Sequence, residues 1–328
     1  MWRSLMGCIV ILTLSIPVAP LATAVQHPGK MARIEWLIAF RAEPGPRFNL
    51  FRQVMHELGW VEGENLILEF RFAELQYERF PELAAELVRQ QPDVIIAHTT
   101  LSALALQRAT TTIPVVMIFV DDAVSEGLVT SLAHPGGNIT GLSIPYAEVC
   151  GKRLEFLRQA IPHLTHLAVL YNPAYPAMAR MVPETRAAAQ ALGMTLHLVE
   201  VHAPSEFDQA FATMTHAHDE ALMVLVDPLV MDYRSRLADL ALQSQLPTMF
   251  DELVQVQAGG LLAYGVSARE VMRRAAYYTD RLLKGAKPAD LPVEQPVKFE
   301  LSINLKTAKA LGITIPPTLL FLADKVIQ

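Results

Sequence analysis

Short apolar runs alternate with helix-length stretches along almost the whole chain, and this alternation limits the possible folds more than any other feature. Val94–Ala97 and Leu222–Val226 are nearly continuous apolar runs, as expected of strands covered on both faces of a sheet. Leu101–Arg108 and Tyr233–Gln243, which follow them, have the spacing of helices. Strands that alternate with helices in this way indicate βαβ units, and therefore an α/β fold built on parallel sheets.

The alternation runs through one set of strands, pauses near Pro145 and then starts again. The predicted strands are Arg33–Phe40, Leu66–Phe72, Asp93–Ala97, Pro114–Phe119 and Asn138–Ser143, then His166–Asn172, Thr195–Val201, Ala221–Asp227, Pro247–Phe250 and Gly260–Tyr264. A predicted helix at Val271–Leu283 and a strand at Lys298–Asn304 follow both sets and can join them. We therefore expect two doubly wound parallel-sheet lobes joined by a hinge: residues 32–144 with about 263–290, and residues 145–262 with about 291–328.

The N-terminus has the pattern of a secretory signal peptide. A positive charge at Arg3 precedes an apolar run from Ile9 to Val18, and the stretch ends in the small residues Ala22-Thr23-Ala24. We expect residues 1–24 to be cleaved and the mature protein to be periplasmic or otherwise extracytoplasmic. Cys150 would then be the single cysteine, so the mature fold must be held by its core and not by a disulfide.

The composition narrows the class of partner. The chain has a formal net charge of −6 at pH 7 and no basic stripe, so it is a poor candidate for binding nucleic acid or anionic lipid. Hydrophobic residues make up 52% of the chain, which fits a well-buried α/β protein. We expect its partners to be small molecules and other proteins, and the chain itself to be a monomer.

Ligands bind beyond the carboxyl ends of the strands in open α/β sheets, and this rule selects most of the candidate site residues. The candidates carry aromatic, hydroxyl, amide and carboxylate groups: Phe40, Thr99, Thr100, Asp121, Asp122, Asn172, Tyr175, Asp227 and Tyr264. Thr99 and Thr100 open a helix whose N–H groups could hold a carboxylate, although Thr100 could instead be an ordinary helix cap. Asp227 could accept an ammonium group, or could form the turn before Pro228. Together these positions would suit the two ends of an α-amino acid, with Phe40, Tyr171, Tyr175 and Tyr264 as apolar walls.

The motifs that mark enzymes are missing from the sequence. It contains no Gly-x-Ser-x-Gly elbow, no Walker loop and no paired Cys-x-x-Cys. His216 and His218 are two residues apart and would not share a helix face, so we expect no metal site. Asp121 and Asp122 could form a carboxylate pair for acid–base chemistry, but no partner nucleophile or base stands out. We expect a protein that is not an enzyme and has no cofactor.

Several segments, in order along nearly the whole mature chain, resemble the substrate-binding proteins of ABC transporters with the type I periplasmic-binding fold. The resemblance is to the branch that includes tryptophan and tyrosine transport proteins. The segments are Leu58–Asn65, Thr111–Val116, Gly127–Gly141, Lys152–Leu157, Tyr171–Pro173 and Asn304–Gly312. One departure is His98-Thr99-Thr100, which stands where relatives usually carry a small, Gly-rich turn.

This resemblance implies a two-lobed venus-flytrap protein that performs no catalysis and delivers a small molecule to a membrane permease. It also implies that the Thr99-Thr100 turn, Asp122, Asn172, Asp227 and Tyr264 line the cleft between the lobes. We expect the solute to be an amino acid or a related polar molecule taken up by an ABC importer. The alternatives are a ligand-sensing module for a receptor kinase and, behind it, a periplasmic enzyme.

Overall fold

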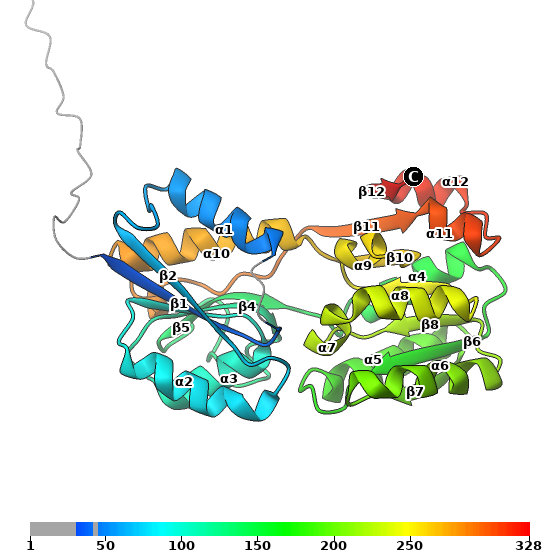
Figure 1. Ribbon diagram of the computed structural model, residues 1–328, viewed down its shortest axis with the longest axis horizontal. Helices are drawn as coiled ribbons and strands as arrows, with labels where there is room; N and C mark the ends of the chain where they lie inside the picture. The colour runs from blue at the N-terminus through cyan, green and yellow to red at the C-terminus, as the bar shows by residue number, and fades with distance from the viewer. Residues whose placement is uncertain (1–30, 42–44) are drawn as a thin grey trace, which may run out of the picture. The chain divides into compact units, whose positions relative to one another are not determined.

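Two β-sheets organise the residues that the computed structural model describes, which are 31–41 and 45–328 (Figure 1). The predicted signal peptide, residues 1–24, lies outside the described residues. The strands of the first sheet, in the order β2-β1-β3-β4-β5, are β1 (Ala32–Ile38), β2 (Leu66–Phe72), β3 (Val94–Ala97), β4 (Val115–Asp121) and β5 (Ile139–Ile144). Those of the second, in the order β12-β11-β10-β9-β8-β6-β7, are β6 (His166–Tyr171), β7 (Thr195–Glu200), β8 (Ala221–Val224), β9 (Thr248–Phe250), β10 (Leu262–Val266), β11 (Phe299–Asn304) and β12 (Lys325–Ile327).

All neighbouring strands of the first sheet are parallel, and helices cover both of its faces. Figure 1 shows α1 (Pro46–Glu57) and α10 (Ala268–Leu283) on one face, and α2 (Phe80–Arg89) and α3 (Thr100–Ala109) on the other. Alternate residues of β1 therefore enter two separate cores: Trp36 packs edge-on against Phe48 and Phe51 under α1, while Leu37 packs beneath α2 and α3. We call this sheet with its four helices the first lobe.

The second lobe is the seven-stranded sheet with its helices. These are α4 (Cys150–Ala160), α5 (Met178–Ala191), α6 (Phe207–His216), α7 (Pro228–Asp232), α8 (Arg234–Gln243), α9 (Leu253–Gln257), α11 (Leu305–Ala310) and α12 (Pro317–Leu322). The predicted doubly wound α/β architecture is confirmed, with one difference: β11 runs antiparallel to β10. β12 and the short helices α7, α9 and α12 were not predicted, because segments of this length show little periodicity.

The chain passes between the two sheets three times within the described residues, at residues 145–149, at Ser267 and at residues 291–298. The third passage runs beside β5, since Glu294 N–H donates to the carbonyl of Gly141 over 2.9 Å. Arg274 of α10 forms an ion pair with Glu294. The predicted hinge corresponds to these three passages. The lobe limits stay a prediction, and the limit expected near residue 263 falls inside β10, which pairs in the second sheet.

Strand β4 contains an irregularity that changes the direction of the side chains at its C-terminal end. Its register with β5 shifts between Met117 and Val120, and Phe119 has a left-handed backbone with a φ of 52°. Opposite it, Gly141 has a φ of 127°, and a Cβ there would lie 2.3 Å from the Met117 carbonyl oxygen. Such bulges commonly direct a side chain toward a functional site.

Gly141→Ala is therefore expected to lower the free energy of unfolding by roughly 3 kcal/mol or more, because it combines backbone strain with a steric clash. Urea unfolding measures the effect. Gly137→Ala is the matched control, since a Cβ at Gly137 meets nothing within 4 Å and should change stability by less than about 0.5 kcal/mol. Equal stability of the two variants would contradict the close approach of β4 and β5.

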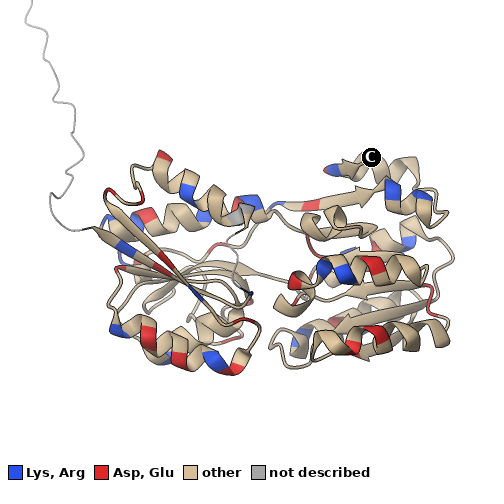
Figure 2. Cartoon of the chain, viewed as in Figure 1, with Lys and Arg blue, Asp and Glu red and all other residues tan. Residues whose placement is uncertain are grey.

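Acidic and basic side chains are interspersed on the exposed helices. Figure 2 shows both signs on helices α1, α2 and α8. Among the residues that the structure describes, no helix combines the length and the apolar character needed to cross a bilayer.

Candidate functional site

A small cavity is lined by residues from both lobes. The first lobe contributes Phe40, His98, Thr99 and Phe119, and the second lobe, with the passage that leads into it, contributes Tyr146, Tyr175, Val226, Asp227, Pro228, Met231 and Glu252. The cavity measures about 30 Å³, which is room for roughly two water molecules. Four residues that the sequence predicted are brought together here, namely Phe40, Thr99, Tyr175 and Asp227.

Asp227 is the buried charge of this cavity. It opens α7, and its Oδ1 accepts a hydrogen bond of 2.6 Å from the Leu229 N–H. Its Oδ2 accepts hydrogen bonds from the Tyr77 hydroxyl at 3.0 Å and from Asn172 Nδ2 at 3.2 Å. Burial raises the pKa of Asp227 to about 6, although the hydrogen bonds oppose the shift. The residue thus caps a helix and also presents a carboxylate to the cavity.

Thr99 and Thr100 have different roles at the start of α3. Thr99 is the cap: its Oγ1 accepts from the Ser102 N–H at 3.2 Å, while its own N–H donates to Ser102 Oγ at 2.9 Å. The interpretation of Thr100 as the cap is therefore wrong. Thr100 Oγ1 accepts from the Asp121 N–H at 3.0 Å, and the backbone and side chain of Thr100 hydrogen-bond the Tyr175 hydroxyl. Thr100 lies beside the cavity and connects α3 of the first lobe to Tyr175 of the second.

His98 and two phenylalanines form an aromatic wall on the side of the first lobe. The His98 ring lies 5.2 Å from the Phe40 ring and 5.1 Å from the Phe119 ring, measured between centroids. Trp36 and Phe48 support it from behind at 6.1 and 5.9 Å. His98 is 2% exposed, so this wall is part of a close-packed core. The bulge in β4 is what brings Phe119 into it.

Asp121 and Asp122 do not line the cavity. Both form ion pairs with Arg180 of α5, so the end of β4 in the first lobe is tied to the second lobe. Burial raises the pKa of the fully buried Asp121. Burial has the same effect on Asp122, but hydrogen bonds from Ser125 together with the Arg180 charge outweigh it and lower the pKa of Asp122.

The remaining predicted residues do not line the cavity. Asn172 is buried and holds Asp227. Tyr264 packs against Phe156 and Phe299, with ring centroids 5.0 and 5.8 Å apart, and is not among the lining residues. Tyr171, considered as an apolar wall, donates from its hydroxyl to Glu200 at 2.6 Å.

The predicted site did not include seven of the lining residues, namely His98, Phe119, Tyr146, Val226, Pro228, Met231 and Glu252. The strand-end rule selects His98, which directly follows β3, but the predicted site kept only its neighbours Thr99 and Thr100; Glu252 is two residues beyond β9, one residue past the segment that the rule selects. Tyr146 lies in the first passage between the lobes, and Met231 in the unpredicted helix α7. No local pattern marks those two positions.

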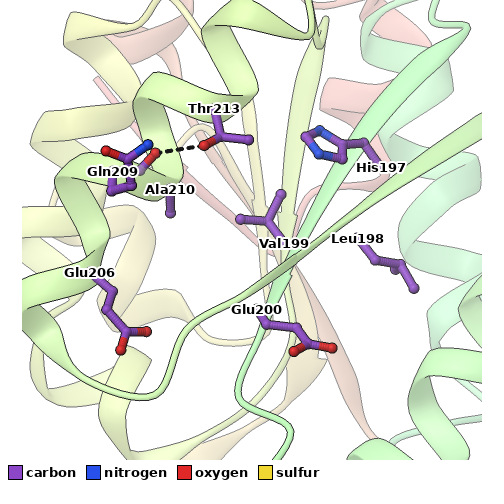
Figure 3. Close-up of a pocket in the computed structure, with 8 residues that line it drawn as sticks. All are labelled: His197, Leu198, Val199, Glu200, Glu206, Gln209, Ala210 and Thr213. Carbon is purple, nitrogen blue, oxygen red and sulfur yellow. Dashed lines mark hydrogen bonds between the residues drawn. The ribbon is translucent and has the colours of Figure 1, made fainter.

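A larger hollow of about 390 Å³ lies on the second lobe alone, between the edge strand β7 and α6 (Figure 3). Its polar groups already have partners: Glu200 accepts from Tyr171, Glu206 accepts from the His202 N–H at 2.7 Å, and His197 contacts Asp219 at 2.6 Å. Figure 3 shows Thr213 turned to the carbonyl of Gln209 within the same helix. We therefore place the candidate site at the smaller cavity between the lobes, where buried polar groups converge.

The lining of that cavity favours an amine. It includes the carboxylates of Asp227 and Glu252, and neither Lys nor Arg. Among the described residues there is no group of three or more His, Cys, Asp and Glu side chains that could hold a metal ion. A cationic group on the ligand would therefore supply the positive charge that the cavity lining does not provide for the Asp227 carboxylate.

Known proteins resemble this chain along most of its length. It is 28% identical over 263 residues to the tyrosine-binding protein of Clostridioides difficile (strain R20291), which covers 80% of this chain and 75% of that protein. A conserved domain protein from Vibrio cholerae has a TM-score of 0.83 and 26% identity, over 90% of this chain and 100% of the other. The ABC domain from Streptococcus pneumonia in complex with L-Trp has a TM-score of 0.82 and 25% identity, over 91% and 100%.

A family match covers the same region. Residues 49–327 match the family described as ABC transporter substrate binding protein. The predicted resemblance is thereby confirmed, and the two α/β lobes correspond to the type I periplasmic-binding fold of these neighbours. The chain belongs to the family of ABC transporter substrate-binding proteins.

Proposed function

We propose that this protein captures an amino acid, or a related small solute with an amino group, for an ABC importer. The family is extracytoplasmic, and its members are binding proteins, not enzymes, that take a small-molecule ligand and work with ABC permeases. Two relatives support an amino acid, since one is named a tyrosine-binding protein and another was solved with L-Trp. Residues 1–24 would direct export.

The observation that carries the proposal is the pairing of Asp227 with the start of α3 across one cavity. Asp227 of the second lobe would accept the ammonium group. The positive end of the α3 dipole, at Thr99 and Thr100 of the first lobe, would attract the carboxylate. Each lobe would thus bind one end of the ligand, so a ligand that spans both ends stabilises the closed state.

Closing the lobes is part of this mechanism. A cavity of about 30 Å³ that is lined from both lobes is smaller than an amino acid, so the lobes must part before the ligand can bind. Side-chain contacts then join the lobes, among them Arg180 with Asp121 and Asp122, Arg41 with Asp232 at 3.1 Å, and Tyr77 with Asp227. We assign Asp121 and Asp122 to closure and not to ligand contact.

Calorimetric titration of the purified mature protein with the proteinogenic amino acids tests this function. We expect one ligand site per chain, and a smaller radius of gyration in small-angle scattering when it is filled. If none of them binds, while another class of solute such as a sugar does, the proposal is wrong.

Binding should weaken as the pH falls below about 6. The amine would interact with ionised Asp227, whose pKa is raised to about 6 by burial. Once that group is protonated, each further unit of acidification should cost up to about tenfold in affinity. Calorimetry at pH 7.5, 6 and 5 measures the trend. A constant affinity over this range would indicate that Asp227 does not hold the amine.

A further inference from the structure

We infer that the closed site accepts only a compact amino-group ligand without an aromatic side chain, and that His98 sets this limit. The inference rests on the proposed function and narrows its class of substrate. It concerns the side-chain portion of the ligand, whereas the pairing of Asp227 with α3 concerns its charged ends.

The first argument is the size of the cavity. Its volume of about 30 Å³ compares with roughly 150 Å³ for an engineered cavity that holds benzene. A phenol or indole side chain therefore has no room once the lobes are closed. A ligand with no more than a methyl or hydroxymethyl side chain requires much less enlargement of the cavity than an aromatic one does.

An aromatic ligand would have to hold the lobes apart, and the interlobe contacts oppose this. The Tyr77 hydroxyl reaches Asp227 at 3.0 Å, and Arg41 both binds Asp232 and stacks 4.5 Å from the centre of the Tyr233 ring. These groups meet only when the lobes are close. A bulky ligand would lose their contribution, and a compact one would keep it.

The second argument is the rigidity of the wall next to the ligand. His98 cannot turn away from the cavity, because Trp36 and Phe48 fill the space behind it and Phe40 and Phe119 stand on either side. Filled cores of this kind yield little to an added ring. Truncating His98 would remove an imidazole that borders the cavity and would extend the available space into the first lobe.

The test compares two groups of ligands on the intact mature protein, namely glycine, L-alanine and L-serine against L-tyrosine and L-tryptophan. Calorimetry and thermal melting should show binding of at least one compact amino acid, with roughly tenfold or weaker affinity for the aromatic ones. His98→Ala should melt at a lower temperature and gain at least roughly tenfold in affinity for L-tyrosine or L-tryptophan. His197→Ala, which removes an imidazole from the hollow outside the site, should leave both affinities unchanged.

The outcomes separate this inference from the proposed function. If the wild-type protein binds L-tryptophan or L-tyrosine as tightly as any compact amino acid, the inference is overturned while the proposed function stands. If no amino acid or small amine binds, the proposed function itself fails. If His98→Ala still prefers compact amino acids to aromatic ones as strongly as the wild type does, the role of His98 is overturned. If His98→Ala does not fold, Met231→Ala tests the size limit instead, because it widens the cavity on the side of the second lobe.

Discussion

Asp227→Asn is expected to weaken the binding of an amine ligand by roughly 100-fold or more, which corresponds to about 3 kcal/mol for the loss of one partner of a buried, hydrogen-bonded charge pair. Asparagine can keep the hydrogen bond from the Leu229 N–H to Oδ1, so helix α7 should persist. The charge is lost without a large change in shape. Calorimetric titration with the best wild-type ligand measures the effect.

The same variant should also remove a dependence of stability on pH. Because the folded-state pKa of Asp227 is raised to about 6 from 3.8, its ionisation opposes folding, and this contribution disappears as the pH falls through 6 toward 4. For this group alone, the free energy of unfolding should be lower at pH 7 than at acidic pH by roughly 3 kcal/mol. Asp227→Asn should therefore show a flatter melting profile between pH 4 and 7 in the absence of ligand.

Asp208→Asn is the matched control, since Asp208 forms an exposed ion pair with Arg236 on the second lobe. It should leave both the affinity and the pH profile at the wild-type values. Wild-type affinity in Asp227→Asn would show that the amine, or the ligand as a whole, binds elsewhere.

Arg180→Ala is expected to destabilise the closed arrangement of the lobes and to weaken ligand binding. Arg180 pairs with Asp121, which is fully buried, and removing it leaves a carboxylate in a site with no compensating cation. Breaking a wholly buried pair costs roughly 3–5 kcal/mol. Arg180 is 33% exposed, so solvent screening reduces this to about 2 kcal/mol.

Scattering and melting measurements separate the two effects of Arg180→Ala. The variant should have a larger radius of gyration with ligand at a concentration that closes the wild-type protein. Its melting temperature should rise relative to the wild type as the pH is lowered, because burial raises the pKa of Asp121. Asp121→Asn combined with Arg180→Ala should recover part of the melting temperature. Arg186→Ala on the exposed face of the same helix is the control and should change stability by less than about 0.5 kcal/mol. An unchanged radius of gyration in Arg180→Ala would exclude this ion pair as a closure contact.

The order of strands and helices could be predicted from the sequence because it depends on local patterns. The limits predicted for the strand at Leu66–Phe72 are those observed for β2, since apolar residues alternate with Glu69 and Arg71 as in a half-buried strand. The antiparallel pairing of β11 could not be predicted, because strand direction depends on how the chain returns after α10. Phe119 lines the cavity because of a bulge in β4, and no sequence pattern predicts that bulge.

The role of the paired aspartates shows the limit of the strand-end rule. The rule places Asp121 and Asp122 correctly at the end of β4, but their partner is Arg180, which lies 59 and 58 residues further along the chain in the other lobe. Such a contact depends on the closed arrangement of two separately folded sheets. Asp227 and Thr99, by contrast, were identified because each lies at the carboxyl end of a predicted strand, where the fold itself exposes polar groups.

Native mass spectrometry of the mature protein, purified without added ligand and then denatured to release what it holds, tests the central claim most directly. We predict one released molecule per chain that carries an amino group and has no aromatic ring, and we predict that Asp227→Asn retains none of it. One bound molecule per chain without an amino group, retained equally by Asp227→Asn, would contradict the account.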